Sequence, residues 1–222
     1  MAYDLEEQEQ LASLQAFWNK YGSIITWVLI AVLGSYAAYN YWNYHQRNQA
    51  VGASTLYSNL QTSFEAKDNA LVQRSAADIQ SKFKSSAYAQ MAALAAAKSA
   101  FDAGDLKTAK AQLNWVVANG SDEYKAIAKL RLSGVLLDEK AYDEALALLA
   151  TPFAAEFAGA AADRKGDVLV AQNKVTEARS AYLAALSAMD KKNPGRRLVE
   201  MKLEAIGGVV PPDAAIASKA AA

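Results

Sequence analysis

The sequence contains no cysteine and only one histidine, His45. The absence of cysteine excludes disulfides, thiolate metal sites and cysteine nucleophiles. A lone histidine is too little for a metal site or a Ser-His-Asp triad, and we interpret His45 as a polar residue near a membrane surface. The sequence also shows no glycine-rich phosphate loop and no marked pair of catalytic carboxylates. We therefore predict a protein that is not an enzyme and needs no cofactor or metal.

Proline and glycine are also scarce, with 4 and 11 residues in 222. The chain beyond residue 46 is rich in Ala, Leu, Lys, Glu and Gln, which favour helices. No stretch alternates β-branched and polar residues. Apolar residues instead recur at intervals of three and four, as in Ala178, Ala181, Tyr182 and Ala185, which is the period of a helix. These features predict an all-α fold.

Charge is balanced, with 23 basic and 23 acidic residues. No clustered basic face of the kind that binds nucleic acid is present, so we expect no nucleic-acid partner. The balance is uneven along the chain, because residues 1–20 hold four acidic residues and one lysine. We define residues 1–20 as an acidic N-terminal tail.

Residues 21–46 contain no Asp, Glu, Lys or Arg, and the apolar centre of this stretch is residues 24–39. About 20 apolar residues suffice for a helix to cross roughly 30 Å of hydrocarbon. We predict one transmembrane helix over residues 21–44, surrounded by membrane lipid. Aromatic residues flank it, as in the aromatic belts of membrane proteins, and those expected at the membrane interface are Trp18, Tyr41, Trp42 and Tyr44.

Two other interpretations of the apolar stretch are a cleaved signal peptide and a buried core helix. A signal peptide begins with a basic region and ends in a small-residue cleavage site. Here an acidic tail precedes the stretch and no clear site follows it. A core helix can be apolar on all sides, but the rest of the chain offers no sheet to bury one.

A repeat of about 34 residues follows the predicted span. Ala109, Ala145 and Ala178 are spaced by 36 and 33 residues. Small residues stand twelve positions before them, apolar residues three before and large residues four after: Ala97, Ser133, Gly166; Leu106, Tyr142, Val175; Leu113, Leu149, Tyr182. This period is typical of tetratricopeptide repeats. We predict a tetratricopeptide-like α-solenoid over residues 45–206, with an alanine-rich helical bundle as the alternative, and a flexible tail over residues 207–222.

Stacked helix pairs form a curved array whose first helices line an inner surface. In this alignment the apolar inner positions of two adjacent pairs are Met91, Leu94, Phe101, Ile127, Leu130 and Leu137. Few polar residues stand among these inner positions. Such an apolar surface suits an apolar peptide or a partner helix. We predict that these six residues bind a partner, the alternative being that they are inter-helix core. Further inner positions are Lys98, Asp163, Asp167 and Val170.

Several segments carry a resemblance to a known family. They are the membrane exit at residues 41–46 (YWNYHQ), the last repeat at residues 163–167 (DRKGD) and 178–182 (ARSAY), and a closing MKL at residues 201–203. In this order and spacing the chain resembles the YfgM-like family, the ancillary SecYEG translocon subunits of Gram-negative bacteria, over roughly residues 10–206. The sequence after Gly207 departs from the family pattern.

The resemblance implies a cytoplasmic N-terminal tail, one inner-membrane helix and a periplasmic repeat domain. It implies as partners the SecYEG translocon, a membrane-anchored periplasmic chaperone of the peptidyl-prolyl isomerase type, and translocated client proteins. The implied work is to assist newly translocated periplasmic or outer-membrane proteins. Two alternatives are a tethered scaffold for envelope complex assembly and a regulatory membrane protein acting through the acidic tail.

Overall fold

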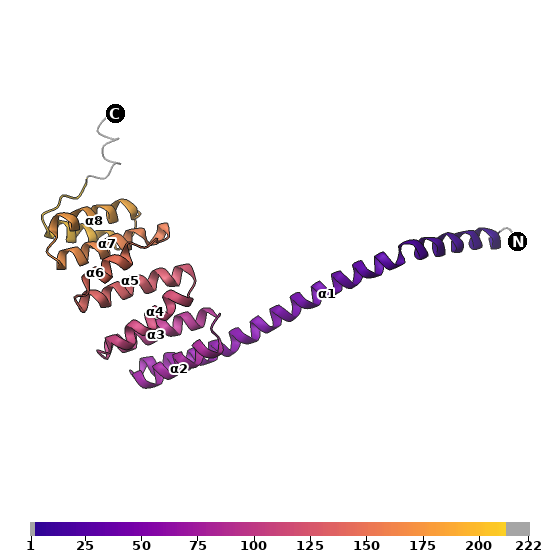
Figure 1. The fold of residues 1–222 in the computed structure, drawn as a ribbon, viewed down its shortest axis with the longest axis horizontal. Helices are drawn as coiled ribbons and strands as arrows, with labels where there is room; N and C mark the ends of the chain where they lie inside the picture. Colours follow the sequence, from indigo (N-terminus) through magenta and orange to yellow (C-terminus); the bar gives the residue numbers. More distant parts are fainter. Residues whose placement is uncertain (1–2, 212–222) are drawn as a thin grey trace, which may run out of the picture. The chain divides into compact units, whose positions relative to one another are not determined.

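The computed structural model describes residues 3–211, apart from the side chains of residues 3–8, His45 and Gln46. Residues 212–222, most of the predicted tail, lie outside the described residues. All regular elements in the described range are α-helices (Figure 1), which confirms the predicted fold class. They are α1 (Tyr3–Glu65), α2 (Asn69–Lys82), α3 (Ala87–Asp102), α4 (Leu106–Asn119), α5 (Asp122–Asp138), α6 (Tyr142–Leu149), α7 (Ala155–Ala171), α8 (Val175–Ala188) and α9 (Arg196–Ala205).

The chain divides into two units, residues 1–52 and residues 53–222. The first unit is the long N-terminal part of α1. By length and composition, α1 is the one helix among the described residues that could cross a membrane. Only 6% of its most apolar window is buried. A core helix would be mostly buried, so the structure argues against the core-helix interpretation of this stretch.

Two hydroxyl groups within the apolar part of α1 are satisfied by the helix itself. The hydroxyl of Thr26 donates to the carbonyl of Gly22 at 2.8 Å, and that of Ser35 donates to Ala31 at 2.8 Å. Such bonds spare a hydroxyl the cost of lying unpaired in hydrocarbon. Large apolar side chains such as Trp27 (70% exposed) and Leu33 (63%) point outward. This surface is suited to contact with lipid.

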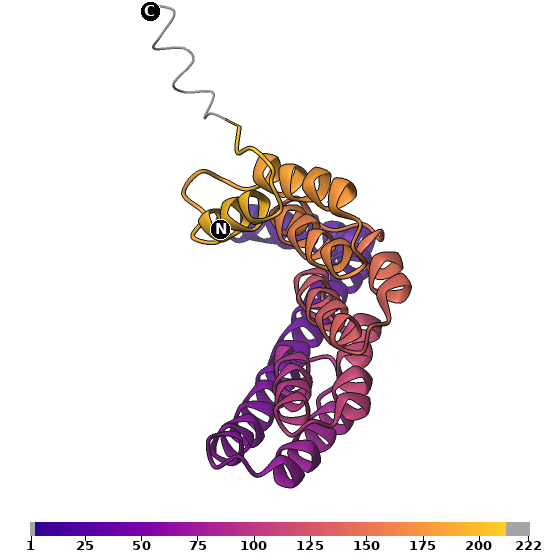
Figure 2. The same cartoon turned by 90° about the vertical axis from the view of Figure 1, so that its left-hand side faces the viewer.

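The second unit consists of antiparallel helix pairs that follow one another in chain order (Figures 1 and 2). The pairs are α3 with α4, α5 with α6, and α7 with α8, preceded by the end of α1 with α2. A turn of the same kind joins the two helices of each pair. The four turns place one residue each in the left-handed conformation: Lys67, Gly104, Lys140 and Asn173. At each turn the same two backbone bonds close the first helix, as in a Schellman motif.

The aligned residues of the last three pairs occupy equivalent places. The small residue seven positions before each turn is buried, and so is the alanine five positions after it. The large residues nine positions after the turn are buried as well: Leu113, Leu149 and Tyr182. Ala97 and Ala109, for example, are 3% and 0% exposed. The small residue allows the second helix to approach closely, and the large residue packs beside it.

The first pair, the end of α1 with α2, has the same turn, but its large and small residues exchange positions. Counting from Lys67, the position of the small residue is taken by Leu60 and that of the large residue by Ala76. Both are fully buried, together with Val72 and Ile79. The large residue thus lies on the first helix and the small one on the second, an exchange of the kind that packed cores tolerate. The residue pattern of the last three pairs therefore does not recur over residues 50–84, although the structure has a fourth helix pair there.

Helix α6 is shorter than its counterparts, with 8 residues against 14 in α4 and 14 in α8. The hydroxyl of Thr151 donates to the carbonyl of Leu148 at 2.7 Å. The next residue, Pro152, has no backbone N–H and cannot continue the helix. Helix α6 therefore ends early, whereas the second helices of the neighbouring pairs, α4 and α8, have no such stop.

Helix α9 closes the array against α7 and α8. Its Val199 and Leu203 are 1% and 0% exposed and lie in one core cluster with Tyr182 of α8. After α9, Gly207 takes a left-handed φ of 73°, and the N–H of Gly208 donates back to the carbonyl of Leu203 at 2.9 Å. The first residues beyond α9 thus complete a helix cap.

Candidate functional site

The first helices of three successive pairs, α3, α5 and α7, lie side by side. Between them is a groove of about 380 Å³. We call it the inner groove. Its lining comes from all three helices and from one residue of α4: Ala97, Lys98, Phe101, Leu113, Arg131, Gly134, Val135, Leu137, Asp138 and Arg164.

Two of the six predicted partner-binding residues line the inner groove. Phe101 of α3 is 40% exposed, and Leu137 of α5 is half-buried. Leu94 is 7% exposed and belongs to the core of the array. Ile127 and Leu130 are half-buried and pack against that same core.

Met91, also half-buried, is not among the lining residues of the inner groove. The structure therefore places Phe101 and Leu137 in the same groove, but it does not bring all six residues into one surface.

Charged residues of the groove were missing from the predicted binding set. Arg131 and Asp138 lie on α5, on the same face as Gly134 because helical residues three and four apart are neighbours. Arg164 reaches over from α7, with its Cζ 3.8 Å from where a Cβ of Gly134 would stand. The spacing of Arg131 and Asp138 around Leu137 was visible in the sequence, whereas the contact between Arg164 and Gly134 was not.

The lining carries three cationic side chains and one acidic one, a net charge of +2. Lys98 is engaged by Asp102 on its own helix, at 2.7 and 2.6 Å. The Nη1 atom of Arg164 lies 3.7 Å from Asp167. Arg131 makes no ion pair with any described residue. Lys98 and Arg164 thus already face Asp102 and Asp167, and the inner groove combines an apolar floor with one cation, Arg131, that no described acid pairs.

Two further inner positions serve the fold. Lys202 of α9 places its Nζ 2.8 Å from Asp163 and 2.8 Å from Asp167, and all three side chains are at least three-quarters buried. The hydroxyl of Tyr182 donates to Asp167 at 2.9 Å. Burial raises the pKa of Tyr182, and the charge of Asp167 raises it further, so the hydroxyl stays a donor. Helix α9 therefore covers the inner surface at this end.

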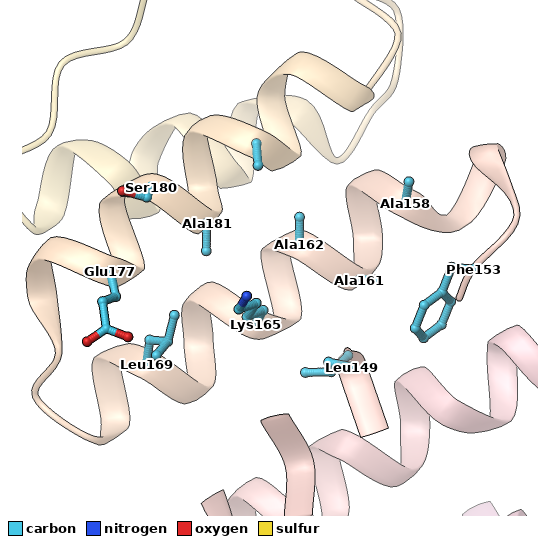
Figure 3. A pocket seen from close by; sticks show the side chains of 11 residues that line it. Leu149, Phe153, Ala158, Ala161, Ala162, Lys165, Leu169, Glu177, Ser180 and Ala181 are labelled. Atoms are coloured by element: carbon cyan, nitrogen blue, oxygen red, sulfur yellow. The ribbon is translucent and has the colours of Figure 1, made fainter. Parts of the chain in front are cut away.

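A second hollow, of about 570 Å³, lies between α7 and α8 beyond the end of α6 (Figure 3). We call it the outer trough. Its floor consists mainly of alanines: Ala158, Ala161, Ala162, Ala181 and Ala184. Leu149 and Phe153 border it on the side of α6, and Lys165 and Glu177 stand on its two walls. The sequence pattern did not predict the outer trough, which arises from the early end of α6.

The residues predicted at the membrane interface project from α1. Trp18, Tyr41, Trp42 and Tyr44 are 59%, 73%, 64% and 65% exposed. The 23 helical steps from Trp18 to Tyr41 span about 34 Å at 1.5 Å each, close to the thickness of a bilayer's hydrocarbon core. Within the described part of the chain, no group of three or more His, Asp or Glu side chains could hold a metal ion.

A family described as a tetratricopeptide repeat-like domain matches residues 15–208. An ancillary SecYEG translocon subunit of Neisseria gonorrhoeae is 35% identical over 208 residues, which cover 93% of this chain and 100% of the relative. The chain belongs to the family of ancillary SecYEG translocon subunits. Ancillary SecYEG translocon subunits of Escherichia coli and Haemophilus influenzae are 31% and 29% identical, over 82% and 91% of this chain and 88% and 98% of theirs. No solved structure matches the chain.

Membership of the ancillary SecYEG translocon subunits confirms the resemblance noted in the sequence. The family match includes most of α1 as well as the helix pairs. It ends at residue 208, within the cap formed by Gly207 and Gly208. The family match therefore covers the apolar stretch of α1 together with the repeats.

Proposed function

We propose that this chain is a non-enzymatic adaptor of the SecYEG translocon, anchored in the bacterial inner membrane by α1. Four observations support the proposal: the names of its relatives, the repeat-like domain, the exposed apolar surface of α1 and its aromatic flanks. In this proposal residues 1–20 are cytoplasmic, residues 21–44 span the membrane, and the helix pairs face the periplasm. Residues 207–222 form the tail.

The inner groove is the site where we place the partner. The observation that carries this assignment is that Phe101 stands exposed beside cations in a groove shared by three repeats. Binding energy in protein interfaces is concentrated in a few large side chains, and arginine and aromatic residues are enriched there. A segment of a translocated client, or of a periplasmic chaperone of the peptidyl-prolyl isomerase type, would place its apolar side chains here.

Anchoring in the membrane would allow weak contacts in the inner groove to bind a partner. A tether converts binding near the channel into an almost intramolecular event with a high effective concentration. A chain emerging from the translocon would meet the groove repeatedly without needing high affinity. The work proposed is therefore to hold or pass on newly translocated proteins, together with the chaperone.

The test is affinity purification from solubilised membranes with the variant Phe101→Asp and, separately, Arg131→Glu. Both side chains are exposed, so the domain should melt within about 0.5 kcal/mol of the wild type. Leu198→Asp is the matched control, because Leu198 is an exposed apolar residue of α9, 55% exposed and outside the groove. We expect the groove variants to lose clients or chaperone, while the control retains them. A folded Phe101→Asp/Arg131→Glu protein that recovers every partner would refute the groove assignment.

Crosslinking from a photoreactive residue at Trp42 tests the translocon assignment separately. Trp42 lies at the predicted exit from the membrane, where a translocon subunit would pass closest to α1. SecYEG subunits as the main adducts would support the proposal. Adducts dominated by envelope-assembly proteins would favour the scaffold alternative, whatever the groove variants show.

A further inference from the structure

The outer trough exists because one helix of the array is short. Helix α4 has 14 residues and α6 has 8, a difference of six. Six residues correspond to about 9 Å of helix, or nearly two turns. Those missing turns would have run along α7, beside α8, where the structure has a hollow of about 570 Å³.

The preceding repeat shows what covers the equivalent surface. There the last turns of α4 place Leu113 and Val116 against Ala128 and Leu132 of α5, and all four are 5% exposed or less. Counting from the turns at Gly104 and Lys140, the counterparts of Leu113 and Val116 are Leu149 and Pro152. The chain leaves the helical path between these two positions, so the second apolar contact is lost.

The floor of the trough is built to receive a helix. The counterparts of Ala128 and Leu132 on α7 are Ala161 and Lys165. Alanines on α7 and α8 let a third backbone approach closely, as small residues do at helix contacts within this array. Lys165 rises from α7 and Glu177 from α8 (Figure 3), and neither makes an ion pair with another described residue.

We infer that the outer trough is a docking site for a short amphipathic helix of a partner protein. This helix takes the place of the missing turns of α6. It presents two large aliphatic side chains one turn apart, as Leu113 and Val116 do, to the alanine floor. Its polar edges carry a carboxylate toward Lys165 and a basic group toward Glu177, because the two walls have opposite charges. The site shares no residue with the inner groove and does not depend on the proposed function.

The probe for this site is a fluorescent peptide that copies α4, residues 106–119, added to the full-length protein in lipid nanodiscs. This peptide supplies the two aliphatic side chains and basic groups, but no carboxylate. We expect binding by fluorescence anisotropy, and its loss when Leu113 and Val116 of the peptide are replaced by Asn. Ala184→Trp fills the trough from an exposed position and should weaken binding by at least about tenfold. Ala77→Trp is the matched control, an exposed alanine of α2, and should leave the affinity within about twofold.

A variant at Lys165 gives an independent check. Lys165→Leu restores the residue type that α4 covers at Leu132 and should tighten binding of the α4 peptide several-fold. Absence of binding, or equal affinities for Ala184→Trp and Ala77→Trp, would overturn the proposal. So would a wild-type dimer that Ala184→Trp converts to a monomer, since a second copy would then fill the trough. A tenfold gain in peptide affinity on removing residues 212–222 would assign the trough to the chain's own tail instead.

Discussion

Gly166 on α7 and Tyr182 on α8 lie so close that no side chain fits between them. A Cβ atom on Gly166 would stand 2.5 Å from Cδ1 of the tyrosine ring. The ring cannot turn aside without loss, because its hydroxyl donates to Asp167 at 2.9 Å. This contact holds together the last helix pair, on which α9 and the outer trough both depend.

Gly166→Ala should therefore destabilise the domain by about 1–3 kcal/mol, the usual cost of overpacking a core. Gly134→Ala is the matched control on α5, where a new Cβ would meet only Arg164, at an ordinary 3.8 Å. Replacing a mid-helix glycine by alanine there should stabilise by about 0.5–1 kcal/mol. Urea unfolding followed by circular dichroism would measure both, and equal effects at the two sites would contradict the close contact.

The bridge between α9 and α7 gives a second prediction. Lys202→Met leaves Asp163 and Asp167 buried without their shared cation, which should cost about 1–3 kcal/mol. Adding Asp163→Asn to Lys202→Met should cost less than the sum of the two single changes, because interacting residues are not additive. Thermal melts of the four proteins complete the cycle, and strictly additive effects would show that the bridge contributes nothing.

The cap of α4 should make stability depend on pH. Asp105 accepts hydrogen bonds from the hydroxyl and the backbone N–H of Thr108, at 2.6 and 3.0 Å, and these bonds lower the pKa of Asp105. A lowered pKa means that the carboxylate stabilises the folded state at neutral pH. That contribution disappears as pH falls through the folded-state pKa, below the ordinary value of 3.8.

Asp105→Ala should accordingly lower the melting temperature at pH 7, and the difference from wild type should shrink as pH falls below about 4. Ser86→Ala is the control, since Ser86 caps α3 through a hydroxyl that does not titrate in this range. Its effect should be constant with pH. A difference for Asp105→Ala that persists unchanged at low pH would rule out the charged cap.

The anchor prediction concerns α1. Val28→Arg places a charge within the apolar stretch and should cost about 3 kcal/mol of insertion free energy. Carbonate should then extract the protein from membranes far more readily than wild type. Gln61→Arg, on an exposed face of the same helix in the second unit, should behave like wild type. An uncleaved native protein that is soluble without detergent would exclude the span.

The sequence by itself determined the helical class, the apolar stretch of α1 and the repeat of the last three pairs. Gly104, Pro152 and the apolar run of α1 act on their own neighbourhoods, through backbone conformation or through length and composition. The alanines at 109, 145 and 178 could be aligned because they recur at a near-constant spacing. Local conformational preferences and the spacing of a repeat can both be recognised in a single sequence.

The tertiary structure decided what stands opposite each helix face. It revealed the exchange of sizes between Leu60 and Ala76, which conceals the first repeat from a residue-by-residue alignment. It also placed Arg164 beside Gly134 and turned Asp163 toward Lys202, so the inner surface is partly cationic and partly closed. These contacts join residues about 16 to 39 positions apart. Periodicity shows that a residue shares a face, but only the packed fold determines its neighbour across the interface.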